Sequence, residues 1–199
     1  MITVSEFRTR VRNNELEELL EQQVLSEGAL HVTAENIEYL QESLALRFGA
    51  SGENVKVWIV GSAKLGFSLT EKNKDGVNLK RYRNFSPGSD IDVAVVSPPI
   101  FSLIWNELST YAHRTARLPW DSRQLGDYMV CGWLRPDHFP KNVRLRHCDD
   151  WWDLFARLSA DRRYGRRRVR GGLFHSVEHM KQYQIRALRD CFVAENLES

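Results

Sequence analysis

Two short runs of apolar, mostly β-branched residues constrain the fold of this chain more than any other feature. Residues 55–60 lead directly into Gly61-Ser62, and residues 91–96 end at Ser97-Pro98-Pro99. Apolar runs of this length that are bounded by turn residues predict buried strands. We therefore expect a sheet built around these two segments.

Helical periodicity surrounds the two runs. Residues 1–50 are expected to be helical, with one helix that Thr33 caps and Gly49 ends. Residues 100–114 and 176–192 also carry apolar side chains at helical spacing, and residues 128–134 are expected to form a third strand. The predicted class is α/β of the α+β kind, a small mixed sheet with flanking helices.

At 199 residues the chain is long enough for one hydrophobic core, and we expect a single domain over 1–199. Its predicted parts are a helical N-terminal segment 1–50, a core 51–140 and a basic helical C-terminal segment 141–199. Residues 69–88 are polar and predict an exposed loop or a weak hairpin. Gly171-Gly172 is expected to form a hinge or turn before the last helix.

Composition narrows the class of protein. Apolar residues make up 42% of the chain and charged residues 27%, as in ordinary globular proteins. No apolar run approaches the ~20 residues that span a bilayer, and the N-terminus has no signal-peptide core. We expect a cytoplasmic protein with no membrane partner.

The three cysteines are too scattered for a zinc or redox motif and are expected to be buried or idle.

Charge is distributed unevenly along the sequence. Residues 1–100 carry 11 basic and 14 acidic side chains, a net charge of −3, whereas residues 101–199 carry 17 and 12, a net charge of +5. The basic half is consistent with an anionic partner, and equally with a solvated surface.

The chemistry of the chain is expected at Asp90 and Asp92. Side chains at positions i and i+2 of a strand lie on one face, so the two carboxylates should converge. Two like charges side by side favour a hard cation, Mg²⁺ or Mn²⁺. The alternative is that one aspartate caps the preceding turn while the other is solvated. The Gly61-Ser62 turn would supply backbone N–H groups and a hydroxyl to a phosphate.

Two segments together resemble the nucleotidyltransferase superfamily, which includes DNA polymerase beta and the minimal nucleotidyltransferases. They are Val60-Gly61-Ser62-Ala63-Lys64-Leu65-Gly66-Phe67-Ser68 and Ser89-Asp90-Ile91-Asp92-Val93. The resemblance implies that Gly61 and Ser62 bind the phosphates of an ATP-like triphosphate and that Asp90 and Asp92 ligate metal. It also implies two-metal catalysis, in which one ion activates an acceptor hydroxyl and the other steadies the leaving pyrophosphate.

The expected function is therefore the metal-dependent transfer of a nucleoside monophosphate from an NTP to a hydroxyl group. The acceptor stays open: an RNA end, a protein, a small molecule or another nucleotide. The family usually adds a third carboxylate from a later strand, for which Asp127 and Asp137 are the candidates. Neither has apolar neighbours on both sides, so the alternative is a non-catalytic nucleotide-binding or RNA-binding protein on the same fold.

Two basic segments are further candidates for binding phosphate. The insertion 70–87 is either a tolerated surface loop or an arm over the triphosphate or an RNA acceptor, through Lys72, Lys74, Lys80, Arg81 and Arg83. Residues 162–170 hold six arginines and Tyr164, which suits either a solvated loop or a site that docks RNA with one stacking ring.

Two other patterns are expected to have a structural role only. The order His175-Ser-Val-Glu178-His179 matches inverted zinc peptidases, whose chemistry also needs a third ligand well downstream, and only 20 residues follow His179. Ordinary surface histidines are the preferred interpretation. The tryptophans, Trp120, Trp133, Trp151 and Trp152, are expected to pack rather than to stack on a ligand.

Overall fold

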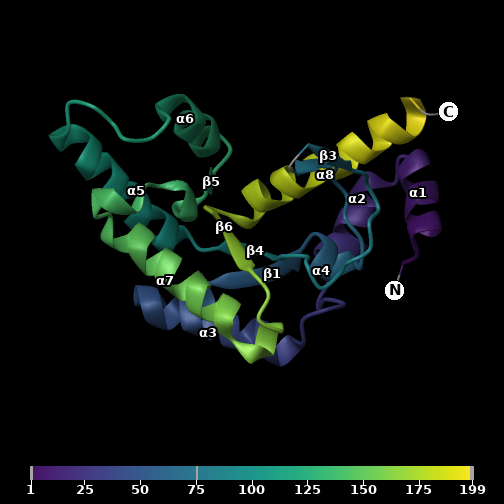
Figure 1. Ribbon diagram of the computed structural model, residues 1–199, viewed down its shortest axis with the longest axis horizontal. Helices are drawn as coiled ribbons and strands as arrows, with labels where there is room; N and C mark the ends of the chain where they lie inside the picture. Colours follow the sequence, from purple (N-terminus) through teal and green to yellow (C-terminus); the bar gives the residue numbers. More distant parts are fainter. Residues whose placement is uncertain (1, 75, 198–199) are drawn as a thin grey trace.

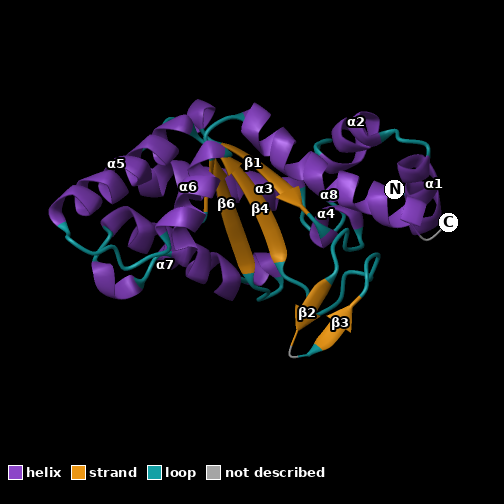
Figure 2. Cartoon of the chain, turned by 90° about the horizontal axis from the view of Figure 1, so that it is seen from above, coloured by secondary structure: helices purple, strands orange, loops and turns teal. Residues whose placement is uncertain are grey.

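A four-stranded mixed sheet lies at the centre of the computed structural model (Figure 1), which describes residues 2–74 and 76–197. The strand order is β1-β4-β6-β5, with β1 antiparallel to β4, β4 parallel to β6 and β5 antiparallel to β6. A separate two-stranded hairpin, β2-β3, projects away from the main sheet (Figure 2). The predicted α+β class with a small mixed sheet is confirmed.

The N-terminal part of the chain is helical. It contains α1 (Val4–Arg12), α2 (Leu16–Leu19), the π-helical turn η1 (Leu20–Val24) and α3 (Ala34–Phe48). The Thr33 hydroxyl accepts a hydrogen bond from the Asn36 amide, and Gly49 ends α3 in the left-handed conformation. Both ends of this helix are therefore where the sequence predicts them.

The first two main strands correspond to the two apolar runs. A short 3₁₀ turn, η2 (Gly52–Asn54), precedes β1 (Lys56–Val60), which leads into the four-residue helix α4 (Ser62–Leu65). The insertion then forms the hairpin of β2 (Lys72–Lys74) and β3 (Val77–Leu79), and β4 (Ile91–Val96) returns beside β1. Of the two structures predicted for this segment, an exposed loop or a weak hairpin, residues 72–79 form the hairpin.

The predicted third strand at 128–134 is wrong over most of its length. After α5 (Pro98–Arg114), the chain forms α6 (Ser122–Val130), and only β5 (Trp133–Leu134) is a strand. The Asp121 carboxylate caps α6 by accepting from the amides of Arg123 and Gln124 at 2.9 and 3.0 Å. Leu125 and Met129 then pack against the core at helical spacing, and this local pattern outweighs the strand propensity of the segment.

The C-terminal part contributes the central strand β6 (Val169–Phe174) as well as the helices α7 (Arg146–Ala160) and α8 (Val177–Leu197). Short 3₁₀ turns, η3 (Pro136–His138), η4 (Lys141–Val143) and η5 (Arg162–Tyr164), link these elements. The helix predicted at residues 176–192 is α8, which continues to Leu197.

Gly171 and Gly172 lie within β6, so the predicted hinge or turn is wrong. A Cβ at Gly171 would lie 2.3 Å from the Phe155 ring, and one at Gly172 would lie 2.9 Å from the Trp133 indole nitrogen. The two glycines are needed because aromatic rings press on both faces of the strand at this point.

Helices cover the two faces of the sheet unequally (Figure 1). The face carrying Ile91, Val93 and Val95 packs on α3, α5 and α7 in the largest cluster of buried side chains. On the opposite face, Ala94 and Val96 pack against Met180 of α8. The polar side chains of β4 and β6 lie on this second face, where α8 covers only part of the sheet.

The long helix α8 also joins the N-terminal helices to the rest of the molecule. Its residues Ile185, Leu188 and Cys191 share a buried cluster with α1, α2 and η1. The Glu195 side chain is only 4% exposed and lies 2.7 Å from the Arg8 guanidinium of α1. No helix in the described part of the chain is both long enough and apolar enough to cross a bilayer.

Candidate functional site

Asp90 and Asp92 lie together at the N-terminal end of β4. Asp92 pairs in register with Val60 on one side and with Arg170 on the other, while Asp90 immediately precedes the strand. Ile91, between the two aspartates, is 1% exposed and belongs to the core. The strand thus places both carboxylates on the partly covered face, as the sequence predicts from their i, i+2 spacing.

The charges around Asp92 come from distant parts of the chain. Burial raises the pKa of the Asp92 carboxyl, and the negative charge of Asp90 raises it further. The positive charges of Lys72, Arg170 and Arg135 lower the same pKa and so oppose this effect. Three cations from the hairpin, β6 and the segment after β5 therefore converge on two carboxylates.

Arg170 holds the position on β6 where a third carboxylate could face Asp92. Its Nε atom lies 3.2 Å from Asp90 Oδ2, and both side chains remain partly exposed. Asp127 lies on the exposed face of α6, and Asp137 is engaged by Arg135 through two contacts of 2.8 and 2.6 Å. Neither of these two candidates is part of the Asp90-Asp92 pair.

The Gly61-Ser62 turn approaches the same carboxylates. Gly61 has φ 65° and ψ −146°, a conformation that favours glycine, and a Cβ there would lie 3.2 Å from Asp92 Oδ2. Ser62, which follows Gly61 at the start of α4, is partly buried. Glycine thus permits the close approach of this turn to Asp92.

A buried lysine anchors the turn from behind. Lys64, in α4, is 8% exposed and donates hydrogen bonds from Nζ to the Ser26 carbonyl at 2.5 Å and to the Gly28 carbonyl. Burial lowers the pKa of its ammonium group. Lys64 therefore connects the turn to the segment before α3, and it does not face a phosphate.

The basic insertion contributes fewer charges to the site than its composition indicates. Lys72 on β2 influences Asp92, as described above. Arg81 bonds to the Leu69 carbonyl at 3.0 Å, and Arg83 bonds to the Thr70 carbonyl at 3.2 Å. Lys80 is exposed, and the Lys74 side chain lies outside the described part of the structure. Among the described basic groups of the insertion, Lys72 thus has the clearest link to the carboxylates.

The residues present fit a magnesium ion that a substrate helps to ligate. Mg²⁺ in proteins is usually held by one or two carboxylates together with substrate phosphates and water. Asp90 and Asp92 are such a pair. Within residues 2–74 and 76–197, no group of three or more His, Cys, Asp or Glu side chains converges on a possible metal position. Water or the oxygen atoms of a bound ligand would therefore have to complete the coordination.

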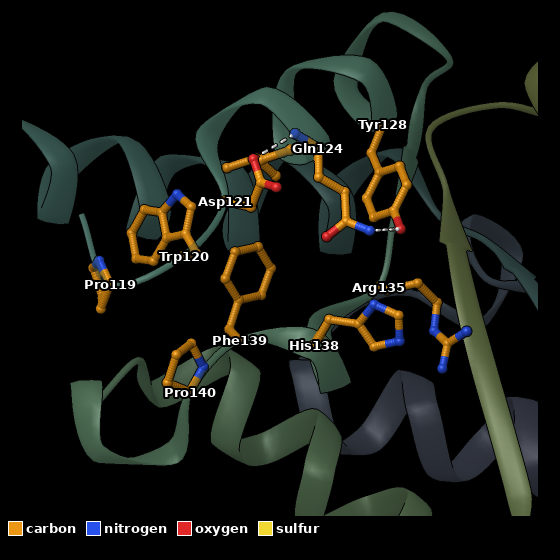
Figure 3. Close-up of a pocket in the computed structure, with 10 residues that line it drawn as sticks. Pro119, Trp120, Asp121, Gln124, Tyr128, Arg135, His138, Phe139 and Pro140 are labelled. Atoms are coloured by element: carbon orange, nitrogen blue, oxygen red, sulfur yellow. Dashed lines mark hydrogen bonds between the residues drawn. The ribbon is translucent and has the colours of Figure 1, made fainter. Parts of the chain in front are cut away.

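A pocket of about 90 Å³ lies between α6 and η3 (Figure 3). Trp120 and Phe139 form its apolar side, and their rings meet edge to face with centroids 5.4 Å apart. Gln124 and His138 supply polar groups. Arg135 lies at the side of the pocket toward β6, where its charge also reaches Asp92.

The arginine-rich segment 162–170 has a mixed role. The predicted stacking ring, Tyr164, is 3% exposed, and its hydroxyl donates to the Asn36 carbonyl at 2.7 Å, so this part of the prediction is wrong. Arg163 pairs with Asp161 at 2.7 Å, and Arg167 lies over the Phe85 ring. Docking of RNA on the exposed remainder stays a prediction.

The histidine motif at the start of α8 has ordinary structural contacts. His179 Nδ1 lies 2.7 Å from the Ser176 hydroxyl, and the His175 ring packs edge-on against Phe101 with centroids 5.3 Å apart. A Cβ at Gly132 would lie 2.4 Å from the His179 ring. These contacts account for the motif without a metal.

The sequence patterns do not identify Arg135, Arg170 or Tyr183 as neighbours of the carboxylates. Burial raises the pKa of Tyr183, and the charges of Asp92 and Arg135 also act on it. Only the register of β6 against β4 brings Arg170 to Asp92.

No family model, curated protein or solved structure matches this chain.

Proposed function

We propose that the protein is a metal-dependent nucleotidyltransferase that transfers a nucleoside monophosphate from an NTP to a hydroxyl acceptor. The observation that carries the proposal is the convergence of Asp90 and Asp92 with the Gly61-Ser62 turn. Gly61 lies so close to Asp92 that a Cβ would be 3.2 Å from the carboxylate. A triphosphate at this turn would therefore lie beside the two groups best suited to hold Mg²⁺.

Each part of the site has a distinct task in this proposal. Asp90 and Asp92 hold the metal, and the Ser62 hydroxyl binds phosphate oxygen. Lys72, Arg135 and Arg170 supply the positive charge that a triphosphate needs, since all three act on Asp92 electrostatically. A bound Mg²⁺ would neutralise the developing charge and lower the pKa of the acceptor hydroxyl. The chain then contributes mainly by holding the reactants in place.

One observation favours a second candidate, a non-catalytic nucleotide-binding or RNA-binding protein. Arg170 stands beside Asp92 in register, and neither Asp127 nor Asp137 joins the pair. The described residues thus place no third carboxylate beside the pair to take the acceptor proton. Binding could then persist without transfer.

The test is transfer of label from each of the four α-labelled NTPs to total RNA or cell lysate, with Mg²⁺ or Mn²⁺. Wild-type protein should transfer label, and Asp90→Asn and Asp92→Asn should abolish it. Asp127→Asn, the same chemical change at an exposed position on α6, is the matched control and should stay active. Binding of NTP with no transfer would favour a non-catalytic nucleotide-binding protein, and the absence of both would refute a role for a nucleotide at this site.

A further inference from the structure

We propose that the pocket between α6 and η3 binds the base of the nucleoside triphosphate. This inference rests on the proposed function and identifies where the base is recognised. The pocket measures about 90 Å³. A single water needs roughly 10–15 Å³ on the same measure, so the space suits one planar ring rather than a lone ion or water.

The apolar side of the pocket offers flat surfaces to a ring. Trp120 contacts two other aromatic rings: its centroid lies 5.4 Å from that of Phe139 and 5.4 Å from that of Tyr111. Both Trp120 and Phe139 pack on the core. Because packing already fixes these side chains, they lose little further conformational entropy when a ring stacks on them. Aromatic side chains of this kind bind bases in nucleic-acid-binding proteins.

The polar side offers neutral hydrogen-bonding groups. Gln124 donates from Nε2 to the Tyr128 hydroxyl at 2.8 Å, which leaves the Gln124 carbonyl and the tyrosine O–H available to a ligand. Burial lowers the pKa of His138, as does the charge of Arg135, which favours the neutral imidazole with its one donor and one acceptor. Figure 3 shows Gln124 and Tyr128 on one side of the open space and His138 on the other.

This combination matches a nucleobase better than other planar groups. A base carries several donors and acceptors around its edge and two faces that stack. A tyrosine side chain from a protein acceptor has one hydroxyl and would leave most of the polar groups in the pocket without a partner. An aliphatic ligand would leave all of them without one, at a cost in binding free energy.

Arg135 connects the pocket with the carboxylates. It lines the pocket, is held by Asp137 and directly follows β5, which pairs with β6, the strand that carries Arg170 beside Asp92. Tyr128 also lines the pocket, and its ring centroid lies 4.4 Å from that of Trp133. The Trp133 centroid lies 4.6 Å from that of Tyr183. A base in the pocket would therefore have its phosphates on the side where Arg135 lies, toward β6.

Calorimetric titration separates the base from the phosphates. The wild-type protein is titrated with ATP, GTP, CTP, UTP and inorganic tripolyphosphate, each with Mg²⁺. At least one NTP should bind roughly tenfold or more tightly than tripolyphosphate, because stacking of a single base contributes on that scale. Trp120→Ala and Gln124→Ala should each remove most of this preference and leave the affinity for tripolyphosphate unchanged.

Two matched variants control for indirect effects. Trp105→Ala removes an exposed tryptophan from α5, and Ser122→Ala changes an exposed residue of α6 that does not line the pocket. Both should bind every ligand as the wild type does. Because Trp120 contributes to packing, circular dichroism must first confirm its fold. Gln124 is exposed, so Gln124→Ala tests the pocket even if Trp120→Ala unfolds.

The possible outcomes distinguish this inference from the proposed function. NTPs that bind no more tightly than tripolyphosphate would overturn the base pocket and leave the phosphate site standing. A preference for NTP that survives both pocket variants would place the base elsewhere and also overturn it. Binding of neither ligand would refute the proposed function together with the inference. Binding of N-acetyltyrosinamide, without a preference for NTP, would assign the pocket to a protein side chain.

Discussion

Arg170 Nε lies 3.2 Å from Asp90 Oδ2, and β6 places this arginine directly beside Asp92 in the sheet register. A positive side chain thus shares the position that a divalent cation would also favour. The ion pair is partly exposed, and such pairs contribute only ~0.2–1 kcal/mol. Arg170 can therefore leave Asp90 and turn to a phosphate at little cost.

Replacing Arg170 should have opposite effects on the two ligands. Arg170→Gln should tighten the binding of Mn²⁺ alone by up to about fivefold, because Asp90 loses a competing cation. It should weaken the binding of Mg-NTP, because the phosphates lose a positive partner. Arg166→Gln, the same change at an exposed site in the adjacent loop, is the control. An equal loss of affinity for Mn²⁺ and Mg-NTP would contradict this role.

Asp92 should cost the protein stability at neutral pH. Burial raises the pKa of its carboxyl above the value in the unfolded chain, so ionisation of Asp92 lowers the free energy of unfolding. This loss is absent at a pH below the pKa of Asp92 in the unfolded chain. It is complete at a pH above the pKa of Asp92 in the folded protein. Asp92→Asn should therefore raise the free energy of unfolding at pH 7 by ~0.5–2 kcal/mol, the range of typical stabilising changes.

The pH dependence of this effect separates charge from packing. Near pH 3, below the usual aspartate pKa of about 3.9, the gain from Asp92→Asn should disappear. Urea unfolding at both pH values measures it, with Asp127→Asn as the control. A loss of stability at pH 7 would show that the charged form of Asp92 is favoured by the fold.

Gly61 should tolerate no side chain. Gly61→Ala forces a Cβ into a backbone conformation suited to glycine and places it 3.2 Å from Asp92 Oδ2. The expected loss is ~1–3 kcal/mol in the free energy of unfolding, with weaker Mg-NTP binding. Gly88→Ala has open space for its Cβ and should change neither quantity. Thermal unfolding and calorimetry together test this, and a fully stable Gly61→Ala would contradict the need for glycine in this turn.

Glu195 should stabilise the packing of α8 on α1. Burial alone would raise the pKa of its carboxyl, but the hydrogen bond from Arg8 and the positive charges of Arg8 and Arg12 lower it. This stability is present above the unfolded pKa of about 4.3 and is lost as the pH falls through the folded value. Glu195→Gln should cost ~1–3 kcal/mol at pH 7.

The measurement is guanidinium unfolding at pH 7 and near pH 3.5, with Glu178→Gln as the control. Glu178 is an exposed carboxylate of the same helix. The difference in the free energy of unfolding between the wild type and Glu195→Gln should become smaller at the lower pH, because the Glu195 carboxylate is then protonated. A difference that stays constant would mean that shape rather than charge is responsible.

Local signals in the sequence predict much of the fold. Thr33 and Gly49 bound α3 because capping depends on a few adjacent residues, and the i, i+2 spacing places Asp90 and Asp92 on one face. In the segment 128–134, β-branched and aromatic residues favour a strand, whereas the cap at Asp121 favours a helix that runs into it. Competing local patterns of this kind need tertiary contacts to decide between them.

Non-local pairing accounts for what the sequence does not predict. The strand β6 follows an arginine-rich segment and contains two glycines, so its pattern indicates a loop. Its parallel pairing with β4 joins residues far apart in the chain and brings Arg170 to Asp92. Arg135 reaches the same site from the segment after β5. No spacing rule relates these positions, so the positive side of the site emerges only from the fold.

Electron paramagnetic resonance of Mn²⁺ tests the central claim most directly, because it counts free and bound metal without requiring a known acceptor. The wild-type protein should bind Mn²⁺ in the presence of NTP, and the double variant Asp90→Asn, Asp92→Asn should bind no more than a solution of Mn²⁺ and NTP alone. The control Asp127→Asn should match the wild type. Equal binding of Mn²⁺ by the wild type and the double variant would contradict the assignment of Asp90 and Asp92 as the metal ligands.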